Sequence, residues 1–95
     1  MKGYWIAHVT VHDIDKYKNY TDLAPKAFAP YKVKMLARGG RYQQLEGNER
    51  HRHVVIEFSS FNDALNCYHS DAYQQAAIHR QGVATAEVVI VEGAE

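Results

Sequence analysis

Apolar residues alternate with polar ones in some stretches of the chain and recur at helical spacing in others. The alternating or continuously apolar pattern typical of β-strands occupies residues 4–11, 33–37, 41–46, 53–58 and 87–92. Apolar side chains recur at three- and four-residue steps, the spacing of one helix face, in residues 14–31 and 61–80. The pattern therefore predicts the order strand, helix, two strands, helix, strand, in which residues 33–37 and 41–46 form either one bent strand or a hairpin with an extra strand.

Short polar residues mark the expected helix boundaries. Asp13 is placed to cap the first helix, and Ser60 and Ser70 are placed to cap two later helical pieces. Gly82 is a suitable residue to end the last piece. Pro25 lies within the first helical region, where it lacks an N–H group and clashes with the preceding turn, so we expect a kink or a break there.

The order of elements is that of a ferredoxin-like α+β domain, βαββαβ, with an antiparallel four-stranded sheet and helices on one face. Residues 1–95 are expected to form a single domain of this kind. The strands at 4–11, 53–58 and 87–92 carry apolar residues on both faces, whereas the helices can cover only one. We therefore expect a homodimer in which two sheets pack face to face.

The composition limits which binding partners and which cellular compartment we expect for this protein. Eleven basic residues balance eleven acidic ones, which argues against nucleic-acid binding because that function needs an excess of positive charge. No apolar run approaches the ~18 residues of a membrane span, and nothing at the start of the chain resembles a signal peptide. The single cysteine, Cys67, makes no internal disulfide. We expect a cytoplasmic protein without nucleic-acid or membrane partners.

A motif of two arginines around two glycines, Arg38-Gly39-Gly40-Arg41, is the most distinctive local feature. Two glycines allow a tight hairpin turn, which would place the arginines opposite each other. Alternatively, the glycines form a bulge inside one bent strand. Paired arginines repel each other, so a bound small anion or an acidic side chain would stabilise them. Arg38 and Arg41 are thus candidate ligand-binding residues, and Glu57 is the expected acidic partner.

The candidates for acid–base chemistry are His8 and Glu57, which lie on strands that neighbour each other in a ferredoxin-like sheet. Such a pair suits proton transfer because imidazole titrates near neutral pH. The structural alternatives are a core histidine with one hydrogen bond and a carboxylate held in an ion pair. Four tyrosines lie on or beside helical stripes, where they either fill the core or line a pocket between helix and sheet: Tyr17, Tyr20, Tyr68 and Tyr73. Tyr17 and Tyr68 are the candidate ligand-binding residues among them.

Metal or cofactor binding has little support in the sequence. His51 and His53 place two imidazoles on one side of a strand, but no third ligand of suitable type lies nearby. No nucleophile elbow or glycine-rich phosphate loop is present. We therefore expect no metal site and no cofactor.

Several segments together resemble the bacterial family called domain of unknown function 1330. The segments that carry the resemblance are Gly3–Val9, Arg38–Gly40, Leu45–Gly47, Val54–Phe58, Cys67–Ser70 with Tyr73, and Val89–Gly93. The resemblance implies membership of the dimeric α+β barrel superfamily, which favours the bulge over the hairpin. That superfamily includes cofactor-free monooxygenases, lactone isomerases and proteins without known activity, and the family itself has no established reaction.

The resemblance and the residues together leave two classes of function open. One is a cofactor-independent enzyme, isomerase-like or monooxygenase-like, that acts on a small metabolite. The alternative is a non-catalytic dimeric module that either binds a small anion or is purely structural.

Overall fold

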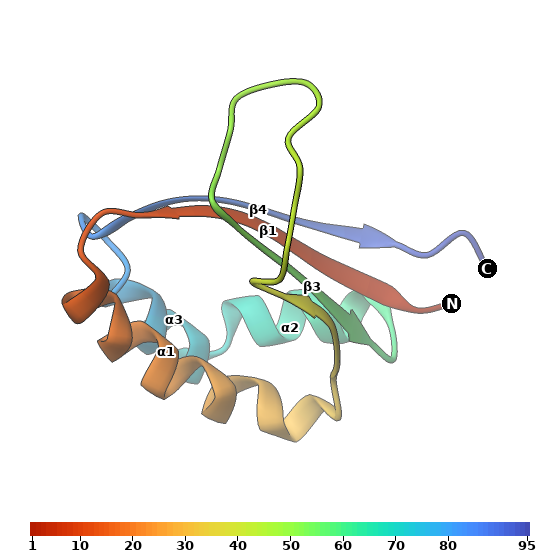
Figure 1. Ribbon diagram of the computed structural model, residues 1–95. Coiled ribbons are helices and arrows are strands. Elements are labelled where there is room, and N and C mark those ends of the chain that lie inside the picture. The colour runs from red at the N-terminus through yellow and green to blue at the C-terminus, as the bar shows by residue number, and fades with distance from the viewer.

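A computed structural model describes residues 1–95 and shows two layers, one of strands and one of helices (Figure 1). The elements are β1 (Gly3–Val11), α1 (Ile14–Phe28), the 3₁₀ helix η1 (Ala29–Tyr31), β2 (Lys34–Arg38), β3 (Arg52–Phe58), α2 (Phe61–His69), α3 (Asp71–Ile78) and β4 (Ala84–Glu92). The strands form one antiparallel sheet in the order β2-β3-β1-β4, and the helices lie on one face of it. The predicted ferredoxin-like α+β class is confirmed. No helix is long and apolar enough to cross a membrane.

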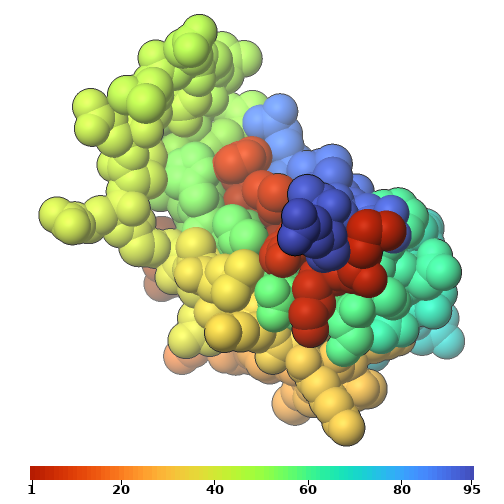
Figure 2. Space-filling model, turned by 90° about the vertical axis from the view of Figure 1, so that its right-hand side faces the viewer, coloured from red at the N-terminus to blue at the C-terminus, as the bar shows by residue number.

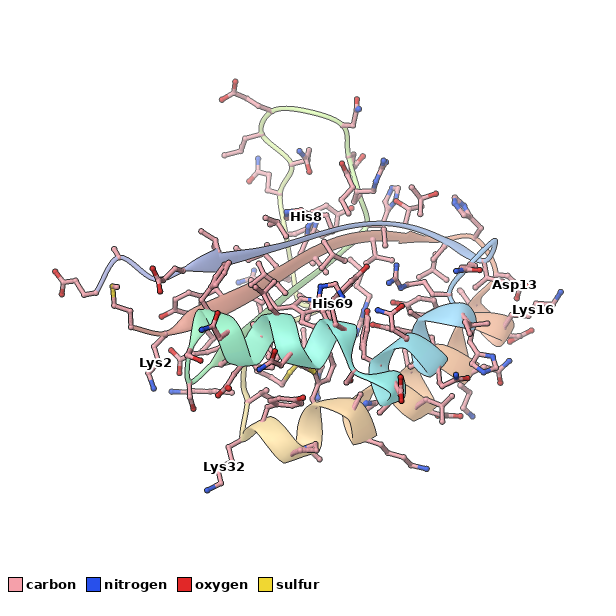
Figure 3. All side chains as sticks on the ribbon, turned by 180° about the vertical axis from the view of Figure 1, so that it is seen from behind. Lys2, His8, Asp13, Lys16, Lys32 and His69 are labelled. Atoms are coloured by element: carbon pink, nitrogen blue, oxygen red, sulfur yellow. The ribbon has the colours of Figure 1, made fainter.

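The three predicted caps are present. Asp13 Oδ1 accepts a hydrogen bond from the backbone N–H of Lys16 at 3.1 Å, at the start of α1 (Figure 3). Ser60 and Ser70 each accept from the backbone N–H three residues further on, at the starts of α2 and α3. Each cap satisfies a backbone donor that has no partner inside its helix, which is why these short polar residues set the boundaries.

The sequence predicts a kink or a break at Pro25, and the break is wrong, because α1 is helical without interruption from Ile14 to Phe28. A kink at Pro25 stays a prediction. The neighbouring residues Ala24 and Ala27 are buried, at 5% and 2% exposure, so packing stabilises the turn that proline weakens. The helix instead gives way to the short η1, in which Pro30 lies close to the N-terminus.

Neither arrangement expected for Gly39 and Gly40 is found. β2 ends at Arg38, and the irregularity in its pairing with β3 lies earlier, between Met35 and Ala37. The predicted strand at residues 41–46 is also wrong, because the chain leaves the sheet there in a loop of residues 39–51. This loop rises on the side of the sheet opposite the helices and projects from the body of the molecule (Figures 1 and 2).

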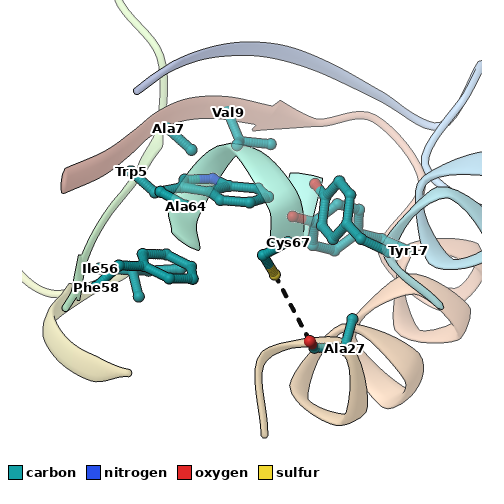
Figure 4. Packing of buried hydrophobic residues seen from close by; sticks show 10 residues of the cluster. Trp5, Ala7, Val9, Tyr17, Ala27, Ile56, Phe58, Ala64 and Cys67 are labelled. Carbon is teal, nitrogen blue, oxygen red and sulfur yellow. Dashed lines mark hydrogen bonds between the residues drawn. The ribbon is translucent and has the colours of Figure 1, made fainter. Parts of the chain in front are cut away.

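The two faces of the sheet have different environments. On the helix-covered face, Trp5, Val9 and Ile56 are almost fully buried, at 2%, 4% and 1% exposure (Figure 4). On the other face, called here the open face, Ile6 pairs with Val55 on β3 and with Val89 on β4. Val89 is 53% exposed. The open face is therefore apolar at its centre and is uncovered in a single chain.

Candidate functional site

A cavity of about 480 Å³ lies between α1 and the helix-covered face of the sheet. It exists because α1 packs mainly against α3, whereas α2 packs against the strands. Its apolar walls include Trp5, Val9, Ala24, Phe28, Val33, Val54, Ile56 and Val88. Its polar lining consists of Tyr17, Tyr20, Thr21, Lys32, Arg38, Arg52, Tyr73 and Arg80, with no Asp, Glu or His. The cavity thus combines apolar walls with hydroxyl groups and positive charge, and has no negative charge of its own.

The most connected polar group in the cavity is a cluster of Tyr20, Tyr73 and Arg80. The hydroxyl oxygens of Tyr20 and Tyr73 lie 2.9 Å apart, which joins α1 to α3. Arg80 Nη2 donates to the Tyr73 hydroxyl at 3.2 Å, and Arg80 Cζ lies 5.4 Å from the centre of the Tyr20 ring. The Trp5 ring packs edge-on against Tyr73 with 4.7 Å between the ring centres. Ring packing and hydrogen bonds together thus fix the position of the Tyr73 hydroxyl.

The titration of this cluster favours neutral hydroxyl groups and a charged guanidinium. Burial raises the pKa of Tyr20, and the neighbouring Tyr73 raises it further. Burial raises the pKa of Tyr17, and the positive charges of Arg52 and Arg80 offset part of that increase. Burial acts to lower the pKa of Arg80, but the oxygens of Tyr73 and Tyr20 outweigh it, so the pKa is raised. Near neutral pH the cavity therefore offers hydrogen-bond donors and positive charge, but no base.

Arg52 owes its position in the cavity to the glycine motif. Gly39 has a φ of +69°, and a Cβ atom added there would collide with the Arg52 guanidinium. Only glycine both adopts that backbone conformation and leaves that space. The sequence interpretation missed Arg52, although its alternation with the apolar residues Val54 and Ile56 was a usable signal that it shares their face.

The predicted ligand-binding residues divide into two groups. Tyr17 and Arg38 line the cavity. Arg41 lies in the 39–51 loop, exposed and outside the cavity lining. Tyr68 also lies outside the lining, and its ring packs on Trp5 with 5.6 Å between the centres. Proximity in the sequence to Arg38 therefore did not bring Arg41 to the same site, because the chain turns away from the sheet at Gly39.

The predicted catalytic pair, His8 and Glu57, lies on the open face and not in the cavity. Figure 3 shows His8 on the side of the sheet away from the helices. Its Nδ1 atom lies 2.7 Å from Nδ1 of His53, whereas Glu57 Oε1 accepts from the Tyr4 hydroxyl at 3.3 Å. The strand register explains this, because His8 faces His53 and Tyr4 faces Glu57. The expected His8–Glu57 contact is therefore not formed.

The expected ion-pair cluster of Glu57 with Arg38 and Arg41 is also absent. The ion pair that the structure contains joins Arg50 to Glu87, with Nε and Oε1 3.2 Å apart. Arg38 points to the helix-covered face, since it pairs with Val54, whereas Glu57 points to the open face. No group of three or more His, Cys, Asp or Glu side chains is arranged to hold a metal ion.

Comparison with known proteins agrees with this fold. The family described as "Domain of unknown function (DUF1330)" matches residues 2–94. No curated protein matches the chain. The RPA0582 protein of Rhodopseudomonas palustris, of unknown function, is similar in structure with a TM-score of 0.78. It is 14% identical, over 99% of this chain and 83% of that one.

Two further solved structures share the fold. SnoaB, a cofactor-independent oxygenase from Streptomyces nogalater, has a TM-score of 0.65 and 12% identity, over 99% of this chain and 94% of that one. A dimeric protein of unknown function and ferredoxin-like fold from Bacteroides fragilis has a TM-score of 0.58 and 12% identity, over 97% and 96%. At these identities the likeness shows the fold alone.

Proposed function

Since this chain belongs to the family called domain of unknown function 1330, whose name leaves the reaction open, we propose a function from the chemistry of the cavity. The protein is a cofactor-independent enzyme that binds a small, largely apolar organic acid under α1. The proposed catalytic contribution is to stabilise the anion that forms when the bound molecule loses a proton. The observation that carries this proposal is the Tyr20–Tyr73–Arg80 cluster in a cavity without any carboxylate.

The physical reason is electrostatic. Hydrogen-bond donors and fixed positive charge within apolar walls favour the charged form of a bound acid. Carboxylates in the lining would compensate the arginines, but there are none, so the positive charge remains available to a ligand. An opposite charge at ~4–6 Å typically lowers the pKa of an acid by about 1–3 units. We expect a shift of that size for a phenol or an enol bound in the cavity.

The class of substrate follows from what the cavity lacks. No imidazole or carboxylate lines it, so no side chain is available as a strong base. The bound molecule must therefore be acidic enough to release its proton to water once the anion is stabilised. Phenols and 1,3-diketones meet this requirement, whereas unactivated hydrocarbons do not.

The resulting anion is the common starting point of two reaction types. Reprotonation at a different atom gives an isomerase-like reaction. Addition of the carbanion to molecular oxygen forms a C–O bond and a peroxide anion, which takes up a proton and loses water to leave a carbonyl group. This second reaction is monooxygenase-like, with the substrate itself supplying the electrons. The fold that this chain shares with SnoaB supports the second type by analogy only.

Spectroscopic titration would test the proposal. Phenols and cyclic 1,3-diketones whose anions absorb at longer wavelength would be titrated with acid and base, free and bound. We expect the pKa of a bound ligand to fall by about 1–3 units and Arg80→Gln to reverse most of that fall. Arg41→Gln, which removes an arginine outside the cavity, is the matched control and should leave the shift intact. A bound pKa equal to or above the free value would contradict anion stabilisation.

A non-catalytic anion-binding module is the second candidate, and the missing base is the observation that favours it. Turnover would distinguish the two. Oxygen uptake and exchange of ligand C–H for deuterium would be followed with the tightest ligand of the panel. An enzyme should accelerate at least one of them over free ligand, and Arg80→Gln should remove the acceleration. Binding with a lowered pKa but without acceleration would favour the binding module.

We also propose that the protein acts as a homodimer joined through the open face. Apolar residues on that face are exposed in the single chain, and the Bacteroides fragilis protein of similar fold is dimeric. The cavity lies on the other face, so the proposed site is complete within one chain.

A further inference from the structure

In the Tyr20–Tyr73–Arg80 cluster, Arg80 fixes which groups donate and which accept hydrogen bonds. A guanidinium carries donors only, so the Tyr73 oxygen must be the acceptor of the 3.2 Å contact with Arg80 Nη2. The hydroxyl of Tyr73 keeps one proton to donate elsewhere. Arg80 Nε is buried and has no hydrogen-bond partner, so one N–H donor of this guanidinium is unpaired.

The proton of Tyr73 has one acceptor within reach. Tyr73 is 1% exposed, and apart from Arg80 the polar side chain that its hydroxyl contacts is Tyr20, at 2.9 Å. Buried hydroxyl groups nearly always donate their proton to a partner. If Tyr20 were the donor instead, the Tyr73 proton would have no acceptor among the protein's side chains, and at 1% exposure Tyr73 has little access to water. Tyr73 therefore donates to Tyr20.

This direction leaves the proton of Tyr20 free. Tyr20 is only half-buried and lines the cavity, and its oxygen already accepts from Tyr73. We propose that Tyr20 donates the hydrogen bond that the anionic oxygen of the ligand accepts, and that Tyr73 and Arg80 are positioning residues that set the direction of its proton. This inference rests on the proposed function for the identity of the site, and it names the residue that touches the ligand.

The arrangement of Tyr20 and Arg80 also limits the chemical class of the ligand. The Tyr20 hydroxyl has a proton free to donate, and the Arg80 guanidinium carbon lies 5.4 Å from the centre of the Tyr20 ring. A donor next to a positive charge favours a ligand oxygen that accepts a hydrogen bond and is negatively charged. Carboxylate, phenolate and enolate oxygens fit this description, and an ammonium group does not. The apolar body of the ligand would lie against Trp5 and Phe28, which favours a planar aromatic or conjugated molecule.

Benzoate and benzamide are suitable probes, because they have nearly the same shape but only benzoate is charged near neutral pH. Binding to each would be measured by calorimetry for the native protein and its variants. We expect the native protein to prefer benzoate. Tyr20→Phe should weaken benzoate binding by about tenfold or more and benzamide binding by much less. The matched control is Tyr31→Phe, which removes a tyrosine hydroxyl outside the cavity lining and should change neither affinity.

The positioning residues have a separate test. Tyr73→Phe should reduce the preference for benzoate by a smaller factor than Tyr20→Phe, because the donor remains but its proton is no longer directed. Arg80→Lys should retain more of the preference than Arg80→Gln, because the charge is kept. Thermal unfolding of each variant would exclude a merely structural effect.

Several outcomes would overturn the inference. If Tyr73→Phe abolishes the preference for benzoate and Tyr20→Phe leaves it intact, Tyr73 is the direct donor. The inference also fails if the native protein does not prefer benzoate. A preference for benzoate that depends on Tyr20, together with unchanged pKa values for bound phenols, would support this inference and refute the proposed function. If the pKa of bound phenols is lowered equally in the native protein and in Tyr20→Phe, the proposed function is supported and this inference is refuted.

Discussion

The imidazole rings of His8 and His53 meet on the open face of the sheet, with 2.7 Å between their Nδ1 atoms. His53 Nε2 also lies 3.0 Å from the backbone carbonyl oxygen of Arg50. A carbonyl only accepts, so neutral His53 must carry its proton on Nε2 and use Nδ1 as an acceptor. His8 must then donate from Nδ1. This assignment leaves Nε2 as the unprotonated nitrogen of the neutral His8 ring.

The first prediction follows from these proton positions. Long-range ¹H–¹⁵N spectra of the neutral imidazoles should show His53 as the Nε2–H tautomer and His8 as the Nδ1–H tautomer. The His8→Gln variant should leave the pKa shift of a ligand in the cavity unchanged, because His8 lies on the opposite face. The reverse tautomers would contradict the assignment, and a lost ligand shift would restore His8 as a candidate for the site.

The second prediction compares Gly39 with Gly40. Gly39→Ala should destabilise the protein by about 1–2 kcal/mol, because φ is +69° and the new Cβ collides with Arg52. Gly40→Ala should be neutral or stabilising by up to about 1 kcal/mol, because a Cβ atom there would meet no neighbouring atom and its φ is not positive. Denaturant unfolding measures both. Equal effects would contradict the left-handed backbone conformation of Gly39, since the end of the Arg52 side chain can move away from a new Cβ atom.

Much of the fold was accessible from the sequence because its causes are local. Alternation along a strand and a short polar residue before a helix are set by neighbouring residues, so the element order and the caps at Asp13, Ser60 and Ser70 were predictable. The continuity of α1 through Pro25 was not, because the burial of Ala24 and Ala27 is a tertiary effect that overrides the local preference of proline.

The site was harder to predict, since both faces of β1 are apolar enough to be covered. Alternation shows that His8 and Trp5 lie on opposite faces, but it does not say which face borders a cavity. The cavity arises because α1 packs on α3, a contact between distant segments. The helical stripes offered Tyr17, Tyr20 and Tyr73 as pocket residues, and all three line the cavity. Arg38, Arg52 and Arg80 also line it, but the sequence pattern did not place them there.

The third prediction concerns Cys67, which is fully buried with Sγ 3.6 Å from the Ala27 carbonyl oxygen (Figure 4). Burial raises the pKa of this thiol to about 12, from 9.0. The thiol should therefore react with a disulfide reagent only as fast as the protein opens. Rapid labelling of the native protein near neutral pH would contradict its burial.

The same shift gives a pH dependence of stability. Between the two pKa values the folded protein holds a proton on Cys67 that the unfolded chain has released, so the free energy of unfolding must fall as pH rises above about 9. Burial also raises the pKa of Tyr17 and Tyr20, which adds to the fall above the ordinary tyrosine pKa of 10.0. Unfolding curves across this range would measure it. In the Cys67→Ala variant the free energy of unfolding should fall less steeply with pH just above pH 9. An unchanged slope would show that Cys67 does not cause the fall.

The last prediction tests the proposed dimer through Val89, at the centre of the open face. Val89 pairs with Ile6, which pairs on its other side with Val55, so three apolar side chains form a row across the sheet. A stable interface over this row should bury at least ~1,000 Å² in total. Sedimentation should show a dimer at micromolar concentration for the native protein. Val89→Asp should shift it to monomer, because an unpaired carboxylate would lose its hydration at the interface.

The matched control is Ile78→Asp. Ile78 is exposed to the same extent as Val89, 54% against 53%, but it ends α3 on the opposite side of the molecule from the open face. Its substitution should leave the dimer intact, since it adds the same charge at an exposed apolar position away from the proposed interface. A native monomer would refute the dimer. Dissociation by Ile78→Asp with retention of the dimer in Val89→Asp would place the interface at the end of α3 and not on the open face.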